Sequence, residues 1–212
     1  MLIYAVADIH GKPERLAVIR QVAEIHCPDV IVVAGDITNF TAPGPAIALL
    51  NGMPAPVLAI RGNTDLMRVE HLLKHCSNIT PLHLSQTIQD TTPFVGLSGT
   101  VPVPFRSRIR FREKQLFKSA EALVNERTVV VAHPPPFGYL DEVFGRIHAG
   151  SRRLYDLVIK YQPMLVLCGH IHECAGMATI GKTRVVNCNM ADQNAGALIE
   201  IDSNRPPRVF FL

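Results

Sequence analysis

The chain has 212 residues, of which 48% are hydrophobic and 18% are charged. This composition supports a sizeable buried core and excludes an intrinsically disordered chain. The formal net charge of +3 is too small to predict nucleic-acid or membrane binding by itself, and no apolar run approaches the roughly 18–20 residues that a membrane-spanning helix needs.

The N-terminal residues, MLIYAVADIH, have no basic segment ahead of the apolar stretch, so we expect no secretory signal peptide. The five cysteines are an odd number with irregular spacing, which favours free thiols in a reducing compartment over a disulfide framework. We therefore expect a cytoplasmic protein that does not enter a membrane.

Short apolar runs alternate with helical patterns along most of the chain. In the first half, strands are predicted at 2–7, 29–35 and 56–62, and helices at 13–26, 45–52 and 65–78. In the second half, helices are predicted near 113–126 and 151–161, and strands at 128–132 and 164–169. Four further strands without helices between them, at 178–181, 183–188, 196–201 and 208–212, form the tail.

The alternation of strands and helices predicts parallel strands with helices on the faces of the sheet. The tail strands suggest a second, partly antiparallel sheet that packs on the first. No repeat, linker or change of composition divides the chain. We therefore predict a single α/β domain over residues 1–212 with two facing sheets.

Residues that can bind metals follow five of the predicted strands. They are Asp8 and His10, Asp36, Asn63, His133, and His170 with His172. The carboxyl ends of parallel strands share one edge of a sheet, where α/β folds place their functional sites. A single Asp or His after a strand means little, but five convergent strand ends of ligand type are hard to explain by helix capping.

Carboxylate, imidazole and amide oxygen together suit divalent ions such as Mn, Fe, Zn or Ni. Seven side chains are more than one ion commonly takes, whereas two ions that share a bridging carboxylate would account for all of them. Paired metal ions are a standard device for the hydrolysis of phosphate esters. The pattern therefore indicates a metal-dependent phosphoesterase.

The ordered motifs D-x-H at 8–10, G-D at 35–36, G-N-x-D at 62–65, His133 and G-H-x-H at 169–172 resemble those of the calcineurin-like metallophosphoesterase superfamily. The stretches HPPPFGYLD at 133–141, HAGS at 148–151 and CGHIHE at 168–173 are similar to its small Icc-related branch. The resemblance implies a β-sandwich of two facing mixed sheets, flanked by helices on both outer sides.

The resemblance also implies a role for each candidate ligand. One ion would be held by Asp8, His10, Asp36 and His172, and Asp36 would bridge to the second ion. The second ion would be held by Asn63, His133 and His170 together with Asp36. A metal-bridging hydroxide would then attack phosphorus in line.

Thr64 departs from the family pattern, because the G-N-H-[DE] motif carries a histidine at this position that is thought to protonate the leaving oxygen or steady the transition state. The role of Asp65, which would orient that histidine, is open for the same reason. Loss of a general acid typically costs about 10²–10⁴-fold for poor leaving groups, which favours activated diesters over unactivated phosphomonoesters. We hypothesise that His148, in the loop after His133, supplies the missing donor; a surface or capping histidine is the alternative.

Other interpretations stay open at this point. Thr64 is compatible with a catalytically weak or inactive scaffold that binds partner proteins, and a nuclease is a third interpretation. Cys168 and Cys174 could form a structural zinc site with His170 and His172. The alternating Arg106, Arg108, Arg110 and Arg112 could grip phosphate oxygens or form a solvated face.

We predict a phosphodiesterase that uses two divalent metal ions (Mn, Fe, Ni or Zn) and acts on a small-molecule phosphate ester. The residues expected to take part in catalysis are Asn63, Thr64, Asp65 and His148. The tail strands also allow a homodimer.

Overall fold

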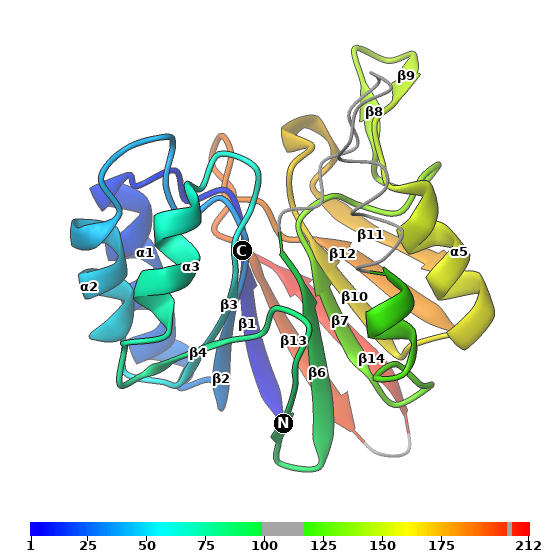
Figure 1. Cartoon of the computed structure of the whole chain (residues 1–212), viewed down its shortest axis with the longest axis horizontal. Coiled ribbons are helices and arrows are strands. Elements are labelled where there is room, and N and C mark those ends of the chain that lie inside the picture. The colour runs from blue at the N-terminus through cyan, green and yellow to red at the C-terminus, as the bar shows by residue number, and fades with distance from the viewer. Residues whose placement is uncertain (99–116, 203–204) are drawn as a thin grey trace.

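The computed structural model describes residues 1–98, 117–202 and 205–212. Two six-stranded mixed sheets face each other, and helices cover their outer faces (Figure 1). This arrangement confirms the predicted pair of facing sheets with flanking helices. No helix in the described ranges is long and apolar enough to cross a membrane.

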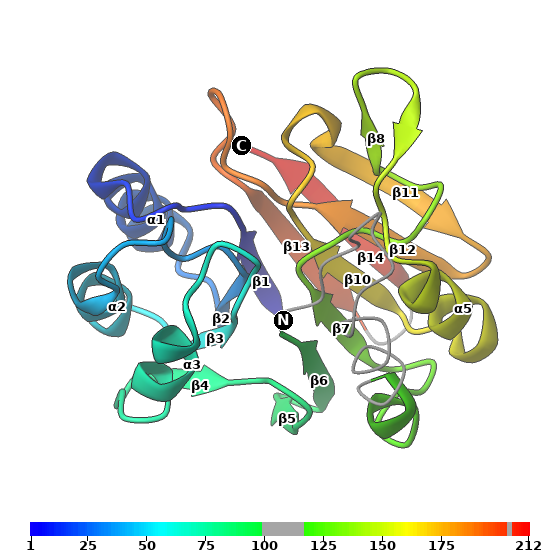
Figure 2. The ribbon, with the colours of Figure 1, turned by 45° about the horizontal axis from the view of Figure 1, so that its top comes forward.

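The first sheet has the strand order β14-β13-β1-β2-β3-β4. Its strands are β1 (Leu2–Val6), β2 (Val30–Ala34), β3 (Val57–Ile60), β4 (Ile79–Pro81), β13 (Ala197–Asp202) and β14 (Arg205–Phe211). Strands β1 to β4 pair in parallel, whereas β13 joins β1 and β14 in antiparallel pairs. The outer face is covered by α1 (Pro13–His26), α2 (Gly44–Asn51) and α3 (Met67–Leu73), as Figures 1 and 2 show.

The second sheet has the strand order β11-β12-β10-β7-β6-β5. Its strands are β5 (Gln86–Gln89), β6 (Thr92–Leu97), β7 (Val129–Ala132), β10 (Leu165–Cys168), β11 (Gly176–Ile180) and β12 (Thr183–Asn187). Its outer face packs against α5 (Arg152–Tyr161) and the short helical segment 117–121. The small hairpin of β8 (Glu142–Val143) and β9 (Ile147–His148) projects from the end of the sandwich (Figure 1).

The hydrophobic core lies in three layers because both faces of the central strands are covered. In β2, Ile31 and Val33 pack toward the helices, whereas Val30 and Val32 pack toward the facing sheet. All five residues of β2 are buried, which explains why the strand is a continuous apolar run rather than an alternating one. The same helix-sheet-sheet-helix layering places the carboxyl ends of strands from both sheets at one end of the sandwich.

The tail strands differ from the prediction. They do not form a sheet of their own: β11 and β12 complete the second sheet, whereas β13 and β14 extend the first. Strand β13 pairs with the free side of β1, and Ala197 and Ile199 are thereby buried between the sheets. The choice of sheet depends on which edge is open in the assembled fold, and a local apolar pattern does not carry that information.

The helix predicted at 113–126 is also shorter than expected in its described part. Residues 117–121 are helical, and the chain then turns, with Asn125 and Thr128 hydrogen-bonded to each other. Residues 113–116 lie outside the described ranges.

Candidate metal centre

Seven polar side chains follow the ends of five strands that belong to both sheets. Asp8 and His10 follow β1, Asp36 follows β2, and Asn63 follows β3 of the first sheet. His133 follows β7, and His170 and His172 follow β10 of the second sheet. The sequence predicted convergence at one edge of one sheet; the structure corrects this to the shared end of two sheets.

Four of these residues turn the backbone sharply where their strands end. Asp8, His10, Asp36 and His170 have φ angles of 59°, 56°, 51° and 72°. Such left-handed values are uncommon for residues other than glycine, and they concentrate at functional sites. The turn after each strand points the side chain across the end of the sandwich instead of along the strand.

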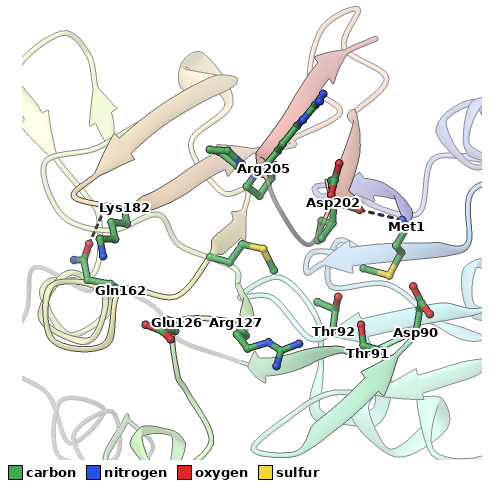
Figure 3. A pocket seen from close by; sticks show the side chains of 14 residues that line it. Met1, Asp90, Thr91, Thr92, Glu126, Arg127, Gln162, Lys182, Asp202 and Arg205 are labelled. Carbon is green, nitrogen blue, oxygen red and sulfur yellow. Dashed lines mark hydrogen bonds between the residues drawn. The ribbon is translucent and has the colours of Figure 1, made fainter.

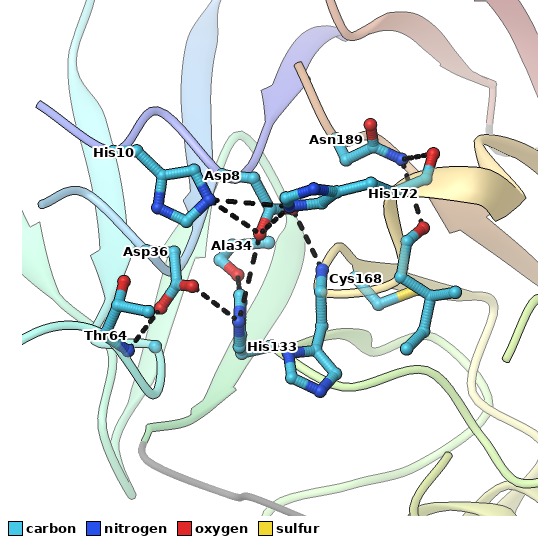
Figure 4. Close-up of polar contacts among 12 residues, drawn as sticks. Asp8, His10, Ala34, Asp36, Thr64, His133, Cys168, His172 and Asn189 are labelled. Carbon is cyan, nitrogen blue, oxygen red and sulfur yellow. Dashed lines mark hydrogen bonds and ion pairs between the residues drawn. The ribbon is translucent and has the colours of Figure 1, made fainter. Parts of the chain in front are cut away.

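Asp8 lies among three imidazoles at the centre of the site (Figure 4). Its Oδ1 atom is 3.4 Å from Nε2 of His172, 3.9 Å from Nε2 of His10 and 4.0 Å from Nε2 of His133. Nε2 of His10 and Nε2 of His172 are 3.4 Å apart. One ligand atom each from Asp8, His10 and His172 lies within 4.8 Å of the others, which is close enough for all three to contact one ion.

A second group shares Asp8 and adds Asp36 and His133. Oδ2 of Asp36 is 3.3 Å from Nε2 of His133. Nδ1 of His133 is 2.9 Å from the carbonyl oxygen of Ala34 and donates to it. This bond leaves Nε2 directed at the carboxylates, which is the arrangement by which a second contact orients a histidine toward a metal ion.

Asn63 and His170 occupy less central positions. The Asn63 Oδ1 atom is buried and has no hydrogen-bond partner. The His170 ring packs edge-on against His133 with ring centroids 5.0 Å apart, and its backbone N–H donates to Oδ2 of Asp8 at 2.9 Å. His170 belongs to neither of the two groups of converging ligand atoms.

Unpartnered buried atoms test whether a cation fits here. Within the described ranges, six buried side-chain nitrogen or oxygen atoms have no hydrogen-bond partner. Four of them are at this site: Asp8 Oδ1, His10 Nδ1, Asn63 Oδ1 and His133 Nε2. Because an unsatisfied buried polar atom is costly, this concentration calls for a ligand. Divalent cations match the set of oxygen and imidazole donors.

The electrostatics of the site favour positive charge. Burial by itself would raise the pKa of Asp36, but the nearby His133 imidazole and the N–H of Thr64 outweigh it and lower the pKa to about 2. Burial works against the charged form of His133 too, yet Asp36 and Asp8 raise its pKa to about 9. A proton on His133 thus partly balances the two carboxylates, and a bound metal ion would take over this role.

Comparison with known proteins identifies the family. A family model described as calcineurin-like phosphoesterase matches residues 1–174. The chain belongs to the calcineurin-like phosphoesterase family. Members of this family are phosphoester hydrolases that use divalent metal ions, so the resemblance drawn from the motifs is confirmed, as is the expected need for divalent metal.

Relatives of this phosphoesterase occur in archaea and animals. It is 28% identical over 202 residues to an uncharacterized protein of Methanocaldococcus jannaschii, in a match that covers 88% of this chain and 87% of that protein. It is 34% identical over 120 residues to a UPF0046 protein of Caenorhabditis elegans, in a match that covers 55% of this chain and 41% of the relative. Neither relative's name assigns an activity.

Solved structures share the fold of this phosphoesterase. TT1561 of Thermus thermophilus matches 99% of this chain and 98% of its own with a TM-score of 0.70 at 16% identity. A dimetal phosphatase from Danio rerio covers 100% and 98% with a TM-score of 0.67 at 10% identity. An archaeal phosphodiesterase covers 100% of both chains with a TM-score of 0.60 at 14% identity. At these identities the likeness establishes the fold alone.

Thr64 and Asp65 are hydrogen-bonded to the loops that carry the candidate ligands of this phosphoesterase. The Thr64 hydroxyl donates to the Thr38 carbonyl oxygen at 2.6 Å, and the Thr64 backbone N–H donates to Oδ1 of Asp36 at 2.9 Å. Asp65 is buried and accepts from the N–H groups of Ile37, Thr38 and Gly62 at 2.7–3.0 Å. Asp65 therefore joins the loops after β2 and β3.

His148 lies on the β8–β9 hairpin and is held by a buried carboxylate. Its Nδ1 is 2.7 Å from Oδ1 of Asp141, whose Oδ2 accepts from the N–H groups of Gly138 and Gly150, both at 2.9 Å. The His148 side chain is 47% exposed, whereas that of Asp141 is 1% exposed. The hairpin contacts the metal end through Cys174, whose thiol bonds to the Glu142 carbonyl oxygen.

Two buried asparagines that the sequence analysis did not single out support the loop with His170 and His172. The amide of Asn187 donates to the Ile171 carbonyl oxygen at 2.8 Å, and that of Asn189 reaches the carbonyl oxygens of Ile171 and His172 at 3.4 Å. Figure 4 shows Asn189 beside His172. In the sequence, the one indication of this role is that two asparagines stand at the end of a buried apolar strand. The guanidinium of Arg15, also not singled out, donates to the carbonyl oxygen of Asp8.

The alternative zinc site with two cysteines is not formed. Cys168 is buried with its thiol on the Val186 carbonyl oxygen, and Cys174 bonds to Glu142. The groups of converging ligands in the described ranges contain no cysteine. The arginines at 106, 108, 110 and 112 lie outside those ranges.

A pocket of about 450 Å³, whose lining side chains Figure 3 shows, lies at the opposite end of the sandwich. Its lining includes Met1, Thr92, Arg127 and Met164, which are at the amino ends of β1, β6, β7 and β10. None of the seven candidate ligands lines it. The pocket is therefore separate from the metal centre.

Proposed function

We propose that this protein is a phosphodiesterase that uses two divalent metal ions to hydrolyse small phosphate diesters. The observation that carries the proposal is the concentration of four buried side-chain atoms without a hydrogen-bond partner among seven side chains of ligand type. A scaffold for protein binding has no physical need for such a set. Membership of a phosphoesterase family supports the same reaction class.

Each candidate ligand has a proposed place. Asp8, His10, Asp36 and His172 would hold one ion, and Asp36, Asn63, His133 and His170 the other. The N–H of Thr64 would orient Asp36, and Asp65 would keep the loops after β2 and β3 at their spacing. Bound divalent ions supply positive charge that activates water and balances charge building up on the phosphate oxygens.

The preference for diesters rests on the surroundings of Thr64. Its hydroxyl is committed to the Thr38 carbonyl oxygen, so it does not face a leaving group as a donor. We place the proton donor at His148 instead, where Asp141 holds Nδ1 and leaves Nε2 available. A donor on a projecting hairpin favours substrates with activated leaving groups or groups large enough to reach it.

The test uses protein stripped of metal and titrated with Mn²⁺, with an activated aryl phosphodiester and the matching aryl phosphomonoester as substrates. We expect metal-dependent turnover that is faster for the diester and is lost in Asp36→Asn. Asp156→Asn, which removes an exposed carboxylate on α5, is the matched control and should keep full activity.

The outcomes separate the alternatives. Faster hydrolysis of the monoester would contradict the diester preference and leave the metal-dependent hydrolase intact. No turnover with Mn²⁺, Ni²⁺ or Zn²⁺ would favour the scaffold, for which the committed hydroxyl of Thr64 is the supporting observation. A steep fall of activity with added salt on a nucleic-acid substrate would favour a nuclease.

A further inference from the structure

The segment after β12 is hydrogen-bonded to both sheets at the metal end of the sandwich. The N–H of Ala7, next to Asp8, donates to the Cys188 carbonyl oxygen at 3.0 Å, and the N–H of Met190 donates to the Ala7 carbonyl oxygen at 3.0 Å. On the other side, the N–H of Cys188 donates to the carbonyl oxygen of Cys168 in β10 at 2.9 Å. The segment thus links the end of β1 to the end of β10.

Two side chains of this segment extend the link to the loop with His172. Asn187 and Asn189 are 0% and 1% exposed, and their amides donate to the carbonyl oxygens of Ile171 and His172. The Asn189 amide also donates to Oδ1 of Asn187 at 3.0 Å, and Oδ1 of Asn189 accepts from the N–H of Ala191. Both amides donate to the loop, so neither can shift without breaking bonds to it.

We propose that residues 187–190 are a positioning element that sets the separation between Asp8 in the first sheet and His172 in the second. The inference rests on the proposed metal centre. Asp8 and His172 reach that centre from different sheets, so their separation depends on the contacts that join the two strand ends. The bonds from His133 to Ala34 and from His170 to Asp8 are two of these contacts, and residues 187–190 supply the others described above. The hydrogen bonds of Ala7 and Asn189 are the ones that join Asp8 to the loop with His172 through the chain itself.

The chemistry of the two side chains suits this role. The loop presents carbonyl oxygens that need a donor, and an amide supplies one without adding charge. A carboxylate in the same place would repel these oxygens and would compete for the metal ion. An aliphatic side chain would leave buried carbonyls without a partner.

The experiment compares Asn189→Ala with Asn78→Ala by calorimetric titration of the metal-free full chain with Mn²⁺. Asn78 is a matched control, because its amide also donates to two backbone carbonyls, those of Met53 and Ala55, and it lies beside β4 away from the ligands. We expect both variants to melt at a lower temperature than the wild type. Only Asn189→Ala should lose Mn²⁺ affinity, by about 10–100-fold.

A double-mutant cycle separates positioning from a general loss of stability. If Asn189 acts through His172, then Asn189→Ala should add no further loss of Mn²⁺ affinity in a His172→Ala background. Asn189→Ser, which retains a donor in a smaller side chain, serves if the alanine variant does not fold and should show a smaller loss. Equal Mn²⁺ affinity in Asn189→Ala and wild type, or full additivity with His172→Ala, would overturn the positioning role of residues 187–190 but not the proposed function. Wild-type protein that binds no metal would overturn the proposed function as well.

Discussion

At the scale of single residues, the site uses backbone conformations that its side chains do not favour. Asp8, His10, Asp36 and His170 all have positive φ angles, although each carries a Cβ atom. Buried polar atoms without partners add a second cost in the metal-free state. The backbone conformation is therefore locally destabilising at the positions where the candidate ligands point across the end of the sandwich.

The conformation of His10 leads to a prediction on stability. In the presence of a chelator, His10→Gly should be more stable than His10→Ala by about 1 kcal/mol, because glycine adopts a φ of 56° without a steric penalty. Urea unfolding of the two variants measures the difference. As a control, Ala17→Gly at an exposed position of α1 should be destabilising by about 1 kcal/mol. Equal stabilities at position 10 would show that its backbone is not strained.

The proposed donor role of His148 predicts a dependence on the leaving group. His148→Ala should lower turnover of diesters with poor leaving groups by about 10²-fold and should barely affect activated ones. It should also change the pH profile for the poor leaving groups. A series of aryl and alkyl diesters measures this, with His26→Ala at the exposed end of α1 as the control. An unchanged rate and pH profile would remove His148 from the mechanism.

At the scale of elements, the loops after β2 and β3 approach each other closely enough to exclude a side chain. A Cβ at Gly62 would overlap the backbone nitrogen and Oδ1 of Asp36. A Cβ at Gly35 would lie 2.7 Å from His133 Nδ1, and Gly35 has a φ of 95°. Strand periodicity predicted where β2 and β3 end. It did not show that Asp65 would be drawn between the two loops, so that α3 begins at Met67 rather than at 65.

Gly62→Ala tests this close approach. The added methyl group should displace the Asp36 carboxylate, reduce Mn²⁺ affinity at least 10-fold and destabilise the protein by about 1–3 kcal/mol. Calorimetric titration and urea unfolding measure the two effects. Gly44→Ala in α2 meets no atom within 4 Å and should leave metal affinity unchanged. Wild-type affinity in Gly62→Ala would mean that the loops can separate without harm to the site.

At the scale of the whole molecule, the proposed metal centre lies where the two sheets meet and depends on both. The first sheet supplies Asp8, His10, Asp36 and Asn63, and the second supplies the three remaining histidines. An ion bound by the proposed ligands would therefore link the two halves of the sandwich. Because an ion that binds only the folded state stabilises it, metal binding and folding are coupled.

Removal of metal should accordingly destabilise the whole protein. Mn²⁺ at about 100 times its dissociation constant adds about 2.7 kcal/mol, which for a chain of this size raises the melting temperature by about 5–10 °C. Scanning calorimetry with Mn²⁺ and then with excess chelator measures the rise and its reversal. The Asp36→Asn variant should show almost no rise. A melting temperature that does not respond to any divalent ion would contradict a metal centre at this end.

The sequence by itself determined most of the strands, the polar residues at their carboxyl ends and the family, because periodicity and motif spacing are local properties of the chain. The tertiary structure alone decided that the ends belong to two sheets, that the tail strands divide between them, and that Asn187 and Asn189 support the His172 loop. It also decided that the Thr64 hydroxyl faces Thr38. These features depend on residues that are far apart in the chain and meet only when the sheets pack, so no local pattern encodes them.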